Sequence, residues 1–443
     1  MTTKIALFGF GTVGKAVHTI FMRELKCTSI DASLDMIVVR DKEKYLSSMD
    51  PDIREIISPL FEDDMNVALQ RLPSFDIIIE VIGGTDTAWE IVKKGLECGK
   101  KVITANKALL AHYMPELEEL SHWSKGMLFY EASVAGGIPI IKSLTRDIQW
   151  GTADAFGVQR ISGILNGTSN YILTEMERRG ITYHVALAEA QSKGYAESDP
   201  SADVEGWDAR AKIQILQRLA YGSINADIVC EGITKIEPID FQYASLLNRK
   251  IKLVATSIAT AEGIRSWVLP TVVSQETSLA TTNGVQNIVT VDHAVLGRVS
   301  MIGLGAGGDP TAHSVVSDVC KAMSTSSMNP VTGVKERWFG TANHTFRFAE
   351  GPVAPMVLPF YVRLTVRDQV GIIADVGRVC EELKISIDAV VQLPVSSVFD
   401  YGDQELQFVV TFNETLYETV MRFKTIVTLR EWNLREPFIM ALV

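Results

Sequence analysis

The sequence predicts an α/β protein in three parts: a doubly wound domain with a parallel sheet, an α+β domain with an open mixed sheet, and a C-terminal ferredoxin-like unit. Strands and helices alternate through residues 1–145, a different mixture follows in 146–300, and a β-α-β-β-α-β order occupies 358–443. At 443 residues the chain is also too long for one core. We expect residues 301–335 to complete the first domain and residues 336–357 to form a linker.

The composition favours a soluble protein that acts on a small molecule. A net charge of −11 argues against nucleic acid and anionic membranes as partners, because both require a basic face. The 5 cysteines are scattered without a C-x-x-C spacing, so neither a disulfide framework nor a zinc site is indicated. No signal peptide and no apolar run of about 18 residues is recognisable. We expect a cytoplasmic location.

The first element is a short apolar strand, Ile5–Phe8, followed by the glycine pattern Gly9-Phe-Gly-Thr-Val-Gly14 and a helix. This order of strand, glycine turn and helix is typical of a Rossmann-type dinucleotide-binding domain. Its glycines let the backbone approach a pyrophosphate at the N-terminus of the helix. The alternative is a glycine turn without a ligand.

The next strands end in candidate cofactor contacts. The strand Met36–Val39 ends at Arg40, which suits the 2′-phosphate of NADP, although the neighbouring Asp41 leaves NAD open. The strand Lys101–Thr104 leads to Lys107, which is either a site residue at a strand end or a solvated lysine at the start of a helix.

Two irregular segments border this domain. The bend Phe129–Pro139 leaves backbone carbonyls without sheet partners, so they need water, protein donors or a cation. The cluster Gly303–Gly308 precedes a helix at Ala312–Met323, and it either meets the cofactor from the far side or forms a plain tight connection.

The middle of the chain carries longer strands and a polar turn, Asn166–Asn170. We expect strands at Phe156–Leu165, Ile251–Ile258, Trp267–Val273 and Gln286–Val299, and helices at Tyr171–Arg178, His184–Ser192 and Ser201–Tyr221. This content predicts one open sheet with helices on a face.

The stretch from Gly194 to Lys212 is the strongest candidate for chemistry. Asp208 and Lys212 are four residues apart on the last predicted helix, so they share a face, and Glu197 on the preceding loop could fold back towards it. Two carboxylates beside an ammonium suit a small substrate with a cationic amine and a reacting oxygen. The alternative is a surface ion pair beside a solvated loop.

The C-terminal unit shows a regular alternation of short elements. Strands are predicted at Tyr361–Val366, Ile385–Val391, Gln407–Phe412 and Pro437–Val443, and helices at Ile373–Leu383 and Thr415–Phe423. It carries no catalytic constellation, so we expect a role in binding or assembly.

With these residues laid out, the chain resembles the homoserine dehydrogenase family over nearly its whole length. Besides the first glycine pattern, the matching segments are Thr104–Ala108, Glu131–Pro139, Asn166–Leu173, Gly194–Lys212 and Gly305–Thr311. The C-terminal unit, with Arg367-Asp-Gln-Val-Gly-Ile372, resembles an ACT domain, an amino-acid-sensing module. Ser198 and Ser169 depart from the usual pattern of the family without removing a charged group.

The resemblance implies NAD(P)-dependent interconversion of L-homoserine and L-aspartate 4-semialdehyde, on the route to threonine, methionine and isoleucine. Lys212 would be the general acid/base, Glu197 and Asp208 would hold the substrate, and Asp203 would support that site. The cofactor, NADP or NAD, would contact Phe10, Gly11, Thr12, Val13, Arg40, Lys107, Gly194 and Gly305. A sodium ion would bind oxygens of Glu131, Val134, Gly136 and Ile138. The second domain would also serve dimerisation, which predicts a homo-oligomer.

Other functions remain to be weighed. A semialdehyde dehydrogenase that forms a thioester needs a cysteine nucleophile, and no cysteine here lies in a recognisable motif. A regulator that binds nucleotide and amino acid without catalysis would not need the set Glu197, Asp208 and Lys212. For the ACT-like unit, feedback by L-threonine or another amino acid competes with a fixed oligomerisation role.

Overall fold

The computed structural model describes residues 2–27, 31–47, 49–148, 157–223, 227–324, 353–394 and 405–443. These residues form two compact units. Unit 1 consists of residues 1–158, 211–224 and 292–350, and unit 2 of residues 159–210, 225–291 and 351–443. The predicted linker at 336–357 lies outside the described residues as far as residue 352, as do residues 325–335 of the segment predicted to complete the first domain.

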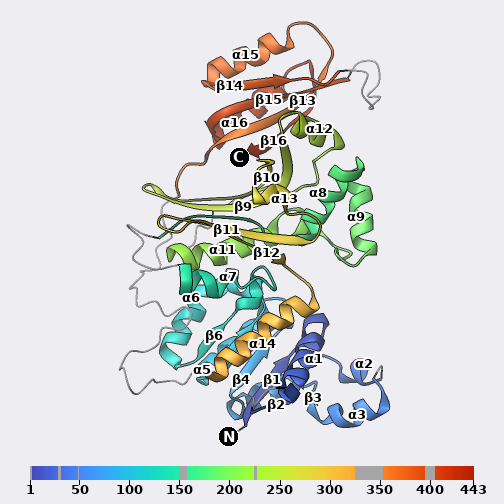
Figure 1. The fold of residues 1–443 in the computed structure, drawn as a ribbon, viewed down its shortest axis with the longest axis vertical. Coiled ribbons are helices and arrows are strands. Elements are labelled where there is room, and N and C mark those ends of the chain that lie inside the picture. The colour runs from blue at the N-terminus through green and yellow to red at the C-terminus, as the bar shows by residue number, and fades with distance from the viewer. Residues whose placement is uncertain are drawn as a thin grey trace. The chain divides into compact units, whose positions relative to one another are not determined.

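Unit 1 is built on a parallel sheet (Figure 1). Its strand order is β3-β2-β1-β4-β5-β6, and every neighbouring pair runs parallel. The strands span Thr3–Phe8 (β1), Ala32–Val38 (β2), Phe61–Glu62 (β3), Ile77–Glu80 (β4), Lys101–Thr104 (β5) and Met127–Phe129 (β6). In this doubly wound order, ligands bind at the carboxyl ends of the strands where the order reverses, here between β1 and β4. The predicted Rossmann-type domain is confirmed.

Helices pack on both faces of this sheet because alternate strand residues point to opposite sides. Ile77 and Ile79 of β4 join the core that α1 and α14 contribute to, and the intervening Ile78 points the other way, towards α5. Gly95 of α5 makes room for it, since a Cβ there would lie 2.8 Å from Ile78 Cδ1. The helices are Thr12–Cys27 (α1), Lys42–Leu46 (α2), Pro51–Ile57 (α3), Met65–Arg71 (α4), Asp86–Glu97 (α5), Lys107–Ser124 (α6), Ile140–Lys142 (α7) and Gly308–Ser324 (α14).

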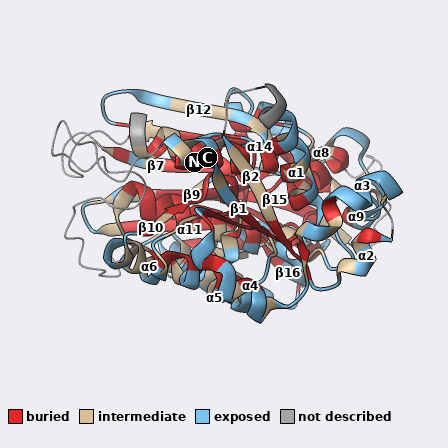
Figure 2. Ribbon diagram, turned by 90° about the horizontal axis from the view of Figure 1, so that it is seen from below, coloured by how far each residue is buried: buried red, intermediate tan, exposed pale blue. Residues whose placement is uncertain are grey.

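Unit 2 contains one continuous mixed sheet, whose strands are largely buried (Figure 2). Its order is β11-β7-β9-β10-β16-β13-β15-β14, and β8 pairs with β10. The strands span Val158–Ile164 (β7), Val229–Cys230 (β8), Arg249–Thr260 (β9), Gly263–Ser274 (β10), Gln286–His293 (β11), Val357–Arg367 (β13), Ile387–Val391 (β14), Glu405–Leu416 (β15) and Asn433–Leu442 (β16). A further strand, β12 (Gly297–Leu304), leads into unit 1. The predicted open mixed sheet is confirmed.

One predicted helix of this region is wrong in its extent. We expected a continuous helix at Ser201–Tyr221, but the structure has α10 (Ser201–Val204) and α11 (Trp207–Tyr221). The break falls at Gly206, whose φ of 85° lies in the left-handed region that a helix cannot continue through. The remaining helices of unit 2 before the C-terminal part are Gly167–Arg179 (α8), Tyr183–Ser192 (α9), Pro238–Leu246 (α12) and Ser278–Thr281 (α13).

The C-terminal part has the predicted β-α-β-β-α-β order, with strands arranged β16-β13-β15-β14. Helices α15 (Ile372–Leu383) and α16 (Tyr417–Thr428) cover one face, where Phe360, Val362 and Leu364 of β13 join their core. The alternate residues of β13, such as Tyr361 and Arg363, are also buried. Together these strands and helices form the predicted ferredoxin-like topology.

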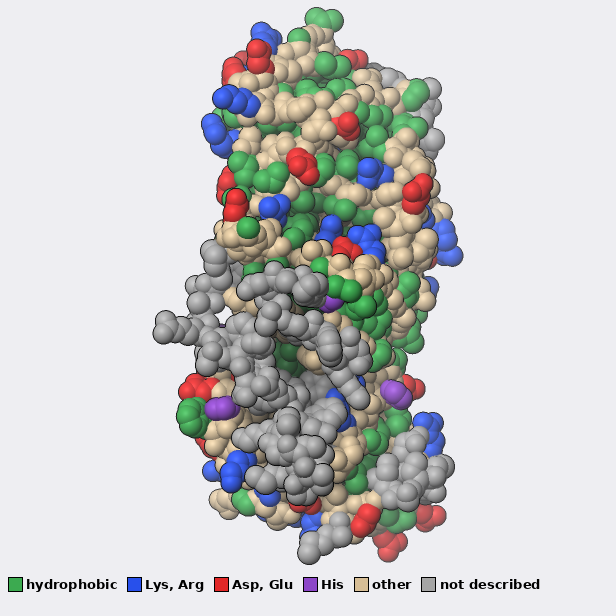
Figure 3. Space-filling model, turned by 60° about the vertical axis from the view of Figure 1, so that its left-hand side comes forward, with side chains coloured by type: hydrophobic (Ala, Val, Ile, Leu, Met, Phe, Trp, Pro, Cys, Tyr) green, Lys and Arg blue, Asp and Glu red, His purple; other side chains and the backbone are tan. Residues whose placement is uncertain are grey.

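Acidic and basic side chains are interspersed over this part at the top of Figure 3.

The second face of this C-terminal sheet packs against α12 through buried polar groups. Arg363, only 4% exposed, lies 2.9 Å from Asp240 and 2.8 Å from Glu237. Tyr361 donates a 2.8 Å hydrogen bond to Asp240, and Tyr243 donates a 2.7 Å hydrogen bond to the backbone of Gln407. Burial raises the pKa of Asp240, while the guanidinium of Arg363 opposes that shift.

Among the helices that the structure describes, none is long and apolar enough to cross a bilayer.

Candidate functional site

The glycine turn after β1 gives each of its three glycines a separate task. Gly9 has a φ of 103°, and a Cβ there would lie 2.7 Å from the Val81 carbonyl oxygen, so only glycine fits this tight turn. A Cβ at Gly14 would clash with the carbonyl oxygen of Gly9, which means that α1 packs directly on the turn. Gly11 has no atom within 4 Å of a Cβ position, so its backbone is open to a ligand. The turn therefore fits a dinucleotide pyrophosphate at the N-terminus of α1.

The carboxyl ends of β4 and β5 are fixed by a buried network. Glu80 accepts hydrogen bonds from Thr104 Oγ1 at 2.5 Å and from the Ile82 amide at 2.9 Å. Asn106 caps α6 by accepting from the Leu109 amide, and its Nδ2 donates to the Gly84 carbonyl at 2.6 Å. Burial raises the pKa of Glu80. The network holds the glycine loop after β4 and sets Lys107 as the first residue of α6.

The second glycine cluster packs on the bend and on the first turn of α1, all within unit 1. A Cβ at Gly136 would lie 2.7 Å from the backbone of Gly305, and a Cβ at Gly308 would lie 3.1 Å from Thr12 Cγ2. The Gly137 amide also donates to the Leu304 carbonyl at 3.0 Å. Gly305 therefore lies beside the bend, and Gly308 lies beside the residues predicted to bind the cofactor.

In unit 2, Asn166 joins two of the predicted acidic residues. Its Nδ2 donates to Asp203 Oδ1 at 2.6 Å and to Asp208 Oδ2 at 2.9 Å. Asn166 and Asp208 are 4% and 5% exposed. The sequence pattern predicts Asn166 in a polar turn and does not indicate that it belongs to the site. Its position could have indicated a site residue, because Asn166 lies at the end of a buried strand and immediately before a helix.

Comparisons with known proteins identify the family of this chain. The family model described as "Homoserine dehydrogenase, NAD binding domain" matches residues 9–131, and the model "Homoserine dehydrogenase" matches residues 139–320. A homoserine dehydrogenase of Pseudomonas aeruginosa is 34% identical over 88% of this chain and 88% of its own length, and one of Corynebacterium glutamicum is 35% identical over 88% and 85%. The chain belongs to the homoserine dehydrogenase family. It is therefore an NAD(P)-dependent oxidoreductase, as the resemblance implied.

Solved structures of the homoserine dehydrogenase family share the fold. The crystal structure of a homoserine dehydrogenase from Thiobacillus denitrificans has a TM-score of 0.85 at 29% identity and covers 100% of this chain and 98% of its own. A hyperthermophilic archaeal homoserine dehydrogenase in complex with NADPH has a TM-score of 0.61 at 28% identity, covering 73% and 98%.

The remaining cofactor candidates of this homoserine dehydrogenase family member lie around the first strands. Phe10 is 5% exposed and its ring contacts Tyr45 and Phe61 edge-on, so its backbone faces the turn while its side chain joins the core. Arg40 is exposed just beyond β2. Asp41, which competed with it in the sequence analysis, accepts the Lys44 amide at 3.1 Å as the N-cap of α2. Asp41 therefore already serves as a helix cap, whereas the exposed Arg40 extends from the end of β2.

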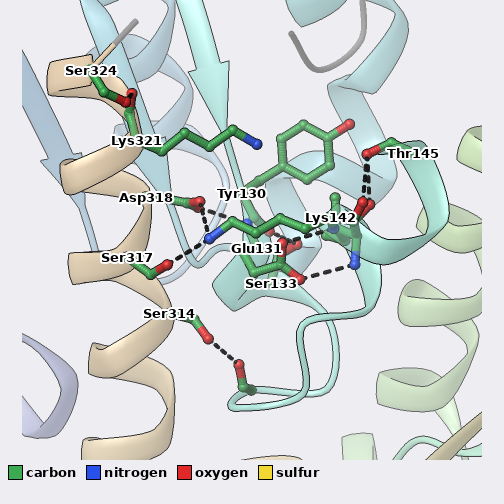
Figure 4. A network of polar contacts seen from close by, with 12 residues as sticks. Tyr130, Glu131, Ser133, Lys142, Thr145, Ser314, Ser317, Asp318, Lys321 and Ser324 are labelled. Atoms are coloured by element: carbon green, nitrogen blue, oxygen red, sulfur yellow. Dashed lines mark hydrogen bonds and ion pairs between the residues drawn. The ribbon is translucent and has the colours of Figure 1, made fainter. Parts of the chain in front are cut away.

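The bend at Glu131–Ile138 is held by a buried carboxylate network (Figure 4). The Glu131 carboxylate accepts from the amides of Ile141 and Lys142, each at 2.9 Å, and the Glu131 amide donates to Asp318. Lys142 Nζ lies 3.3 Å from Asp318 and donates to Ser317 at 2.7 Å. Burial, with the nearby Asp318 charge, raises the pKa of Glu131 to about 7. The network joins the start of the bend to α7 on one side and to Asp318 of α14 on the other.

Two of the four carbonyls predicted to bind sodium have protein donors. The Gly136 carbonyl accepts from Ser314 Oγ at 2.7 Å, and the Ile138 carbonyl accepts from the Ile140 amide at 2.7 Å. Protein donors were among the alternatives weighed from the sequence. A carbonyl oxygen keeps a second lone pair, so a cation would share these two oxygens with the donors. The buried Val134 carries the third predicted carbonyl of the bend.

The last predicted site residues lie on the loop before α10 and on α11. Gly194 has a φ of 73°, and Thr168 Oγ1 donates to the neighbouring Tyr195 carbonyl at 2.8 Å. Glu197 is exposed, and its backbone carbonyl accepts from Gln191 Nε2 at 3.0 Å. Lys212 is 5% exposed and follows Asp208 by one helical turn. Asp208 is thus grouped with Asp203 through Asn166, while Glu197 lies on the exposed loop.

Proposed function

We propose that this protein interconverts L-aspartate 4-semialdehyde and L-homoserine, on the route to threonine, methionine and isoleucine. The observation that carries the proposal is the pairing of Asp203 and Asp208 on one amide, with Lys212 one helical turn further along α11. Asp208 and Lys212 are each 5% exposed, and burying acidic and basic side chains is costly, so their burial in a family of oxidoreductases supports a catalytic role.

The mechanism assigns a separate task to each of these side chains. When bound, a nicotinamide dinucleotide would supply the hydride for the aldehyde carbon, or accept it from the carbon that bears the alcohol. Lys212, as an ammonium, stabilises the negative charge that develops on the substrate oxygen and donates the proton. Glu197 accepts from the substrate α-ammonium, and Asp208 holds either that group or the Lys212 ammonium. An ordinary lysine is a poor base at neutral pH, so oxidation of homoserine should be faster at alkaline pH.

For the cofactor we propose a preference for NADP. The support is the exposed Arg40 beyond β2 together with the engagement of Asp41 as a helix cap. The archaeal relative that was solved with NADPH is consistent with this choice.

Initial rates with L-homoserine test substrate, cofactor and the lysine argument together. We expect reduction of NADP without added phosphate, a higher KM for NAD than for NADP, and a rate that rises between pH 7 and pH 9. Homoserine-dependent reduction of neither dinucleotide would refute the proposed reaction. A lower KM for NAD would refute only the cofactor preference.

We further propose that residues 358–443 form an ACT domain through which L-threonine or a related amino acid regulates a homo-oligomer. The support is the ferredoxin-like strand order of the described C-terminal residues. Rates and light-scattering mass, each with and without threonine, methionine and isoleucine, test this. A fixed oligomerisation module would leave both quantities unchanged with all three amino acids.

We propose, last, that the bend Glu131–Ile138 binds sodium through the carbonyls of Glu131, Val134, Gly136 and Ile138. The left-handed φ angles of Ala135 and Gly136, 55° and 49°, support a bend shaped to turn its backbone around a central point. Replacing sodium chloride by choline chloride at equal ionic strength should lower the melting temperature. No change in melting temperature would argue against the sodium site.

A further inference from the structure

The side chain of Arg218, in the last turn of α11, is bound on two sides. Its Nη2 donates to Glu118 Oε2 of α6 at 2.6 Å, and its Nε donates to the same oxygen at 3.2 Å. Its Nη1 donates to the carbonyl of Gly222, just beyond the end of its own helix. The side chains of Arg218 and Glu118 are only 9% and 14% exposed. The guanidinium therefore joins the end of α11 to α6 at a place largely shielded from solvent.

The same two helices carry the two predicted site lysines. Lys107 is the first residue of α6, and Lys212, 5% exposed, lies in the second turn of α11. Residues 211–224 belong to unit 1, as α6 does. The ion pair of Arg218 and Glu118 therefore connects, within one compact unit, the helix that begins at Lys107 to the helix segment that contains Lys212.

A small rotation of α11 would move Lys212 by a distance that matters for proton transfer. A side-chain atom about 6 Å from a helix axis moves by about 1 Å when the helix rotates by about 10°. A misplacement of that size can cost about a hundredfold in rate. The buried Ile213 and Leu216 hold the helix but specify its rotation less strictly, because the hydrophobic effect is non-directional. A planar guanidinium bound at two places is directional, so Arg218 is suited to fix the rotation.

We propose that Arg218 is a positioning residue, which sets the rotation of α11 through Glu118 so that Lys212 reaches the substrate oxygen. This inference rests on the proposed function, in which Lys212 is the general acid/base. Arg218 also contributes to stability, because its loss leaves a carboxylate buried without a cation. Burial raises the pKa of Glu118, while the hydrogen bond and charge of Arg218 oppose that shift. Position and stability therefore have to be measured separately.

Two variants separate position from stability. Arg218→Met removes the guanidinium and leaves the Glu118 carboxylate buried. The double variant Arg218→Met/Glu118→Met removes both charges, and replacing a buried ion pair by apolar residues of similar volume is often neutral for stability. Neither variant keeps the ion pair between α6 and α11. As a matched control, Arg363→Met removes another buried arginine, 4% exposed, from its ion pair with Asp240 in unit 2.

The test measures kcat and KM for homoserine, the dissociation constant of NADPH from its fluorescence, and the melting temperature, with all kinetics well below the lowest melting temperature. We expect Arg218→Met to lower kcat at least about tenfold, because Lys212 is misplaced, and to leave the NADPH dissociation constant within about twofold. The double variant should recover at least half of the lost melting temperature and keep the low kcat. Arg363→Met should lose melting temperature and keep kcat within about twofold.

Three results in an active enzyme would overturn the inference and leave the proposed reaction standing. They are a kcat of Arg218→Met within about twofold of wild type, a kcat that recovers with the melting temperature in the double variant, and an equal loss of kcat in Arg363→Met. Wild type that oxidises no homoserine refutes the proposed function, and this inference with it. If Arg218→Met does not fold, the double variant decides, because it leaves no unpaired charge at this site. A kcat within about twofold of wild type in that variant overturns the inference.

Discussion

Lys212 and Lys252 are both buried lysines, but their surroundings differ. Lys252, on β9, donates to the Thr282 carbonyl at 2.7 Å, to Asn283 Oδ1 at 3.0 Å and to Asn170 Oδ1 at 3.3 Å. Three neutral oxygens satisfy its ammonium without neutralising its charge, and burial lowers its pKa to about 8. Lys212 instead follows the carboxylate of Asp208 by one helical turn. Lys252 is therefore a structural lysine, whereas Lys212 is the lysine proposed above for proton transfer.

Replacing Lys212 by alanine should lower turnover by at least about a hundredfold, because the proton donor for the forming alkoxide is lost. Affinity for NADPH, followed by its fluorescence on titration, should stay within about twofold. Lys235→Ala removes an exposed lysine with an ion pair to Glu436 and serves as the control. Near-normal turnover of Lys212→Ala would exclude this lysine as the acid.

Lys252 should make stability depend on pH above neutrality. Its folded pKa is about 8 and its unfolded value about 10.5, so between these values the unfolded chain binds the extra proton. Stability from this group therefore rises with pH in that window. Raising the pH from 8 to 9.5 should stabilise wild type relative to Lys252→Met by about 2 kcal/mol, as measured by chemical denaturation. Lys250→Met, on the same strand, should show no such trend. A free energy of unfolding that falls with rising pH for wild type, relative to Lys252→Met, would contradict the assignment.

At the scale of elements, the six-residue turn between β1 and α1 contains some glycines that the fold requires and one that is open to a ligand. Gly9 and Gly14 are required by the protein's own backbone, whereas Gly11 faces open space. The same sequence pattern thus contains positions whose substitution should affect different properties.

Gly14→Ala should lower the melting temperature, since its methyl group would meet the rigid Gly9 carbonyl and overpacking costs about 1–3 kcal/mol. Gly11→Ala should leave the melting temperature within about 1 °C and raise KM for NADP by at least about tenfold, because its methyl occupies the path of the pyrophosphate. Calorimetry and initial rates on both variants check this. A destabilised Gly11→Ala with normal NADP binding would reverse the assignment.

The sequence predicted elements where periodicity was strong and missed features that depend on distant contacts. The glycine turn, the parallel strands and the ferredoxin-like order follow from local patterns, and the structure contains them. The break at Gly206 was missed because its left-handed φ and its close packing depend on distant residues: a Cβ there would lie 3.1 Å from Cys230 Sγ. Asn166 was not assigned because its partners, Asp203 and Asp208, lie about forty residues away in the chain.

At the scale of unit 2 as a whole, the C-terminal part is joined to the middle of the chain in two ways. Strand β16 pairs in parallel with β10 at Thr271 and Val272, which makes one sheet of both parts. The buried contacts of Arg363 with Asp240 and Glu237 then connect β13 to α12. Together these connections join the C-terminal ferredoxin-like part of unit 2 to the part of unit 2 that contains Asp203 and Asp208.

Replacing Arg363 by methionine should lower the melting temperature by several degrees, because it leaves the Asp240 charge buried without its cation, at a cost of about 3–5 kcal/mol. The double variant Arg363→Met/Asp240→Asn should recover at least half of that loss. Arg435→Met, whose ion pairs with Glu237 and Glu405 are half exposed, is the matched control. A double variant no more stable than Arg363→Met would show that packing, and not charge, is lost.

The pairing of β16 with β10 also bears on how this enzyme can be dissected. A chain cut before β13 would leave the edge of β10 at Thr271 and Val272 without its partner strand, next to apolar residues that are now covered, and such open edges recruit strands from other molecules. Loss of activity in a shortened protein would then reflect self-association rather than relief from inhibition. Point substitutions on α15 or α16 are therefore the sounder way to test the proposed regulation.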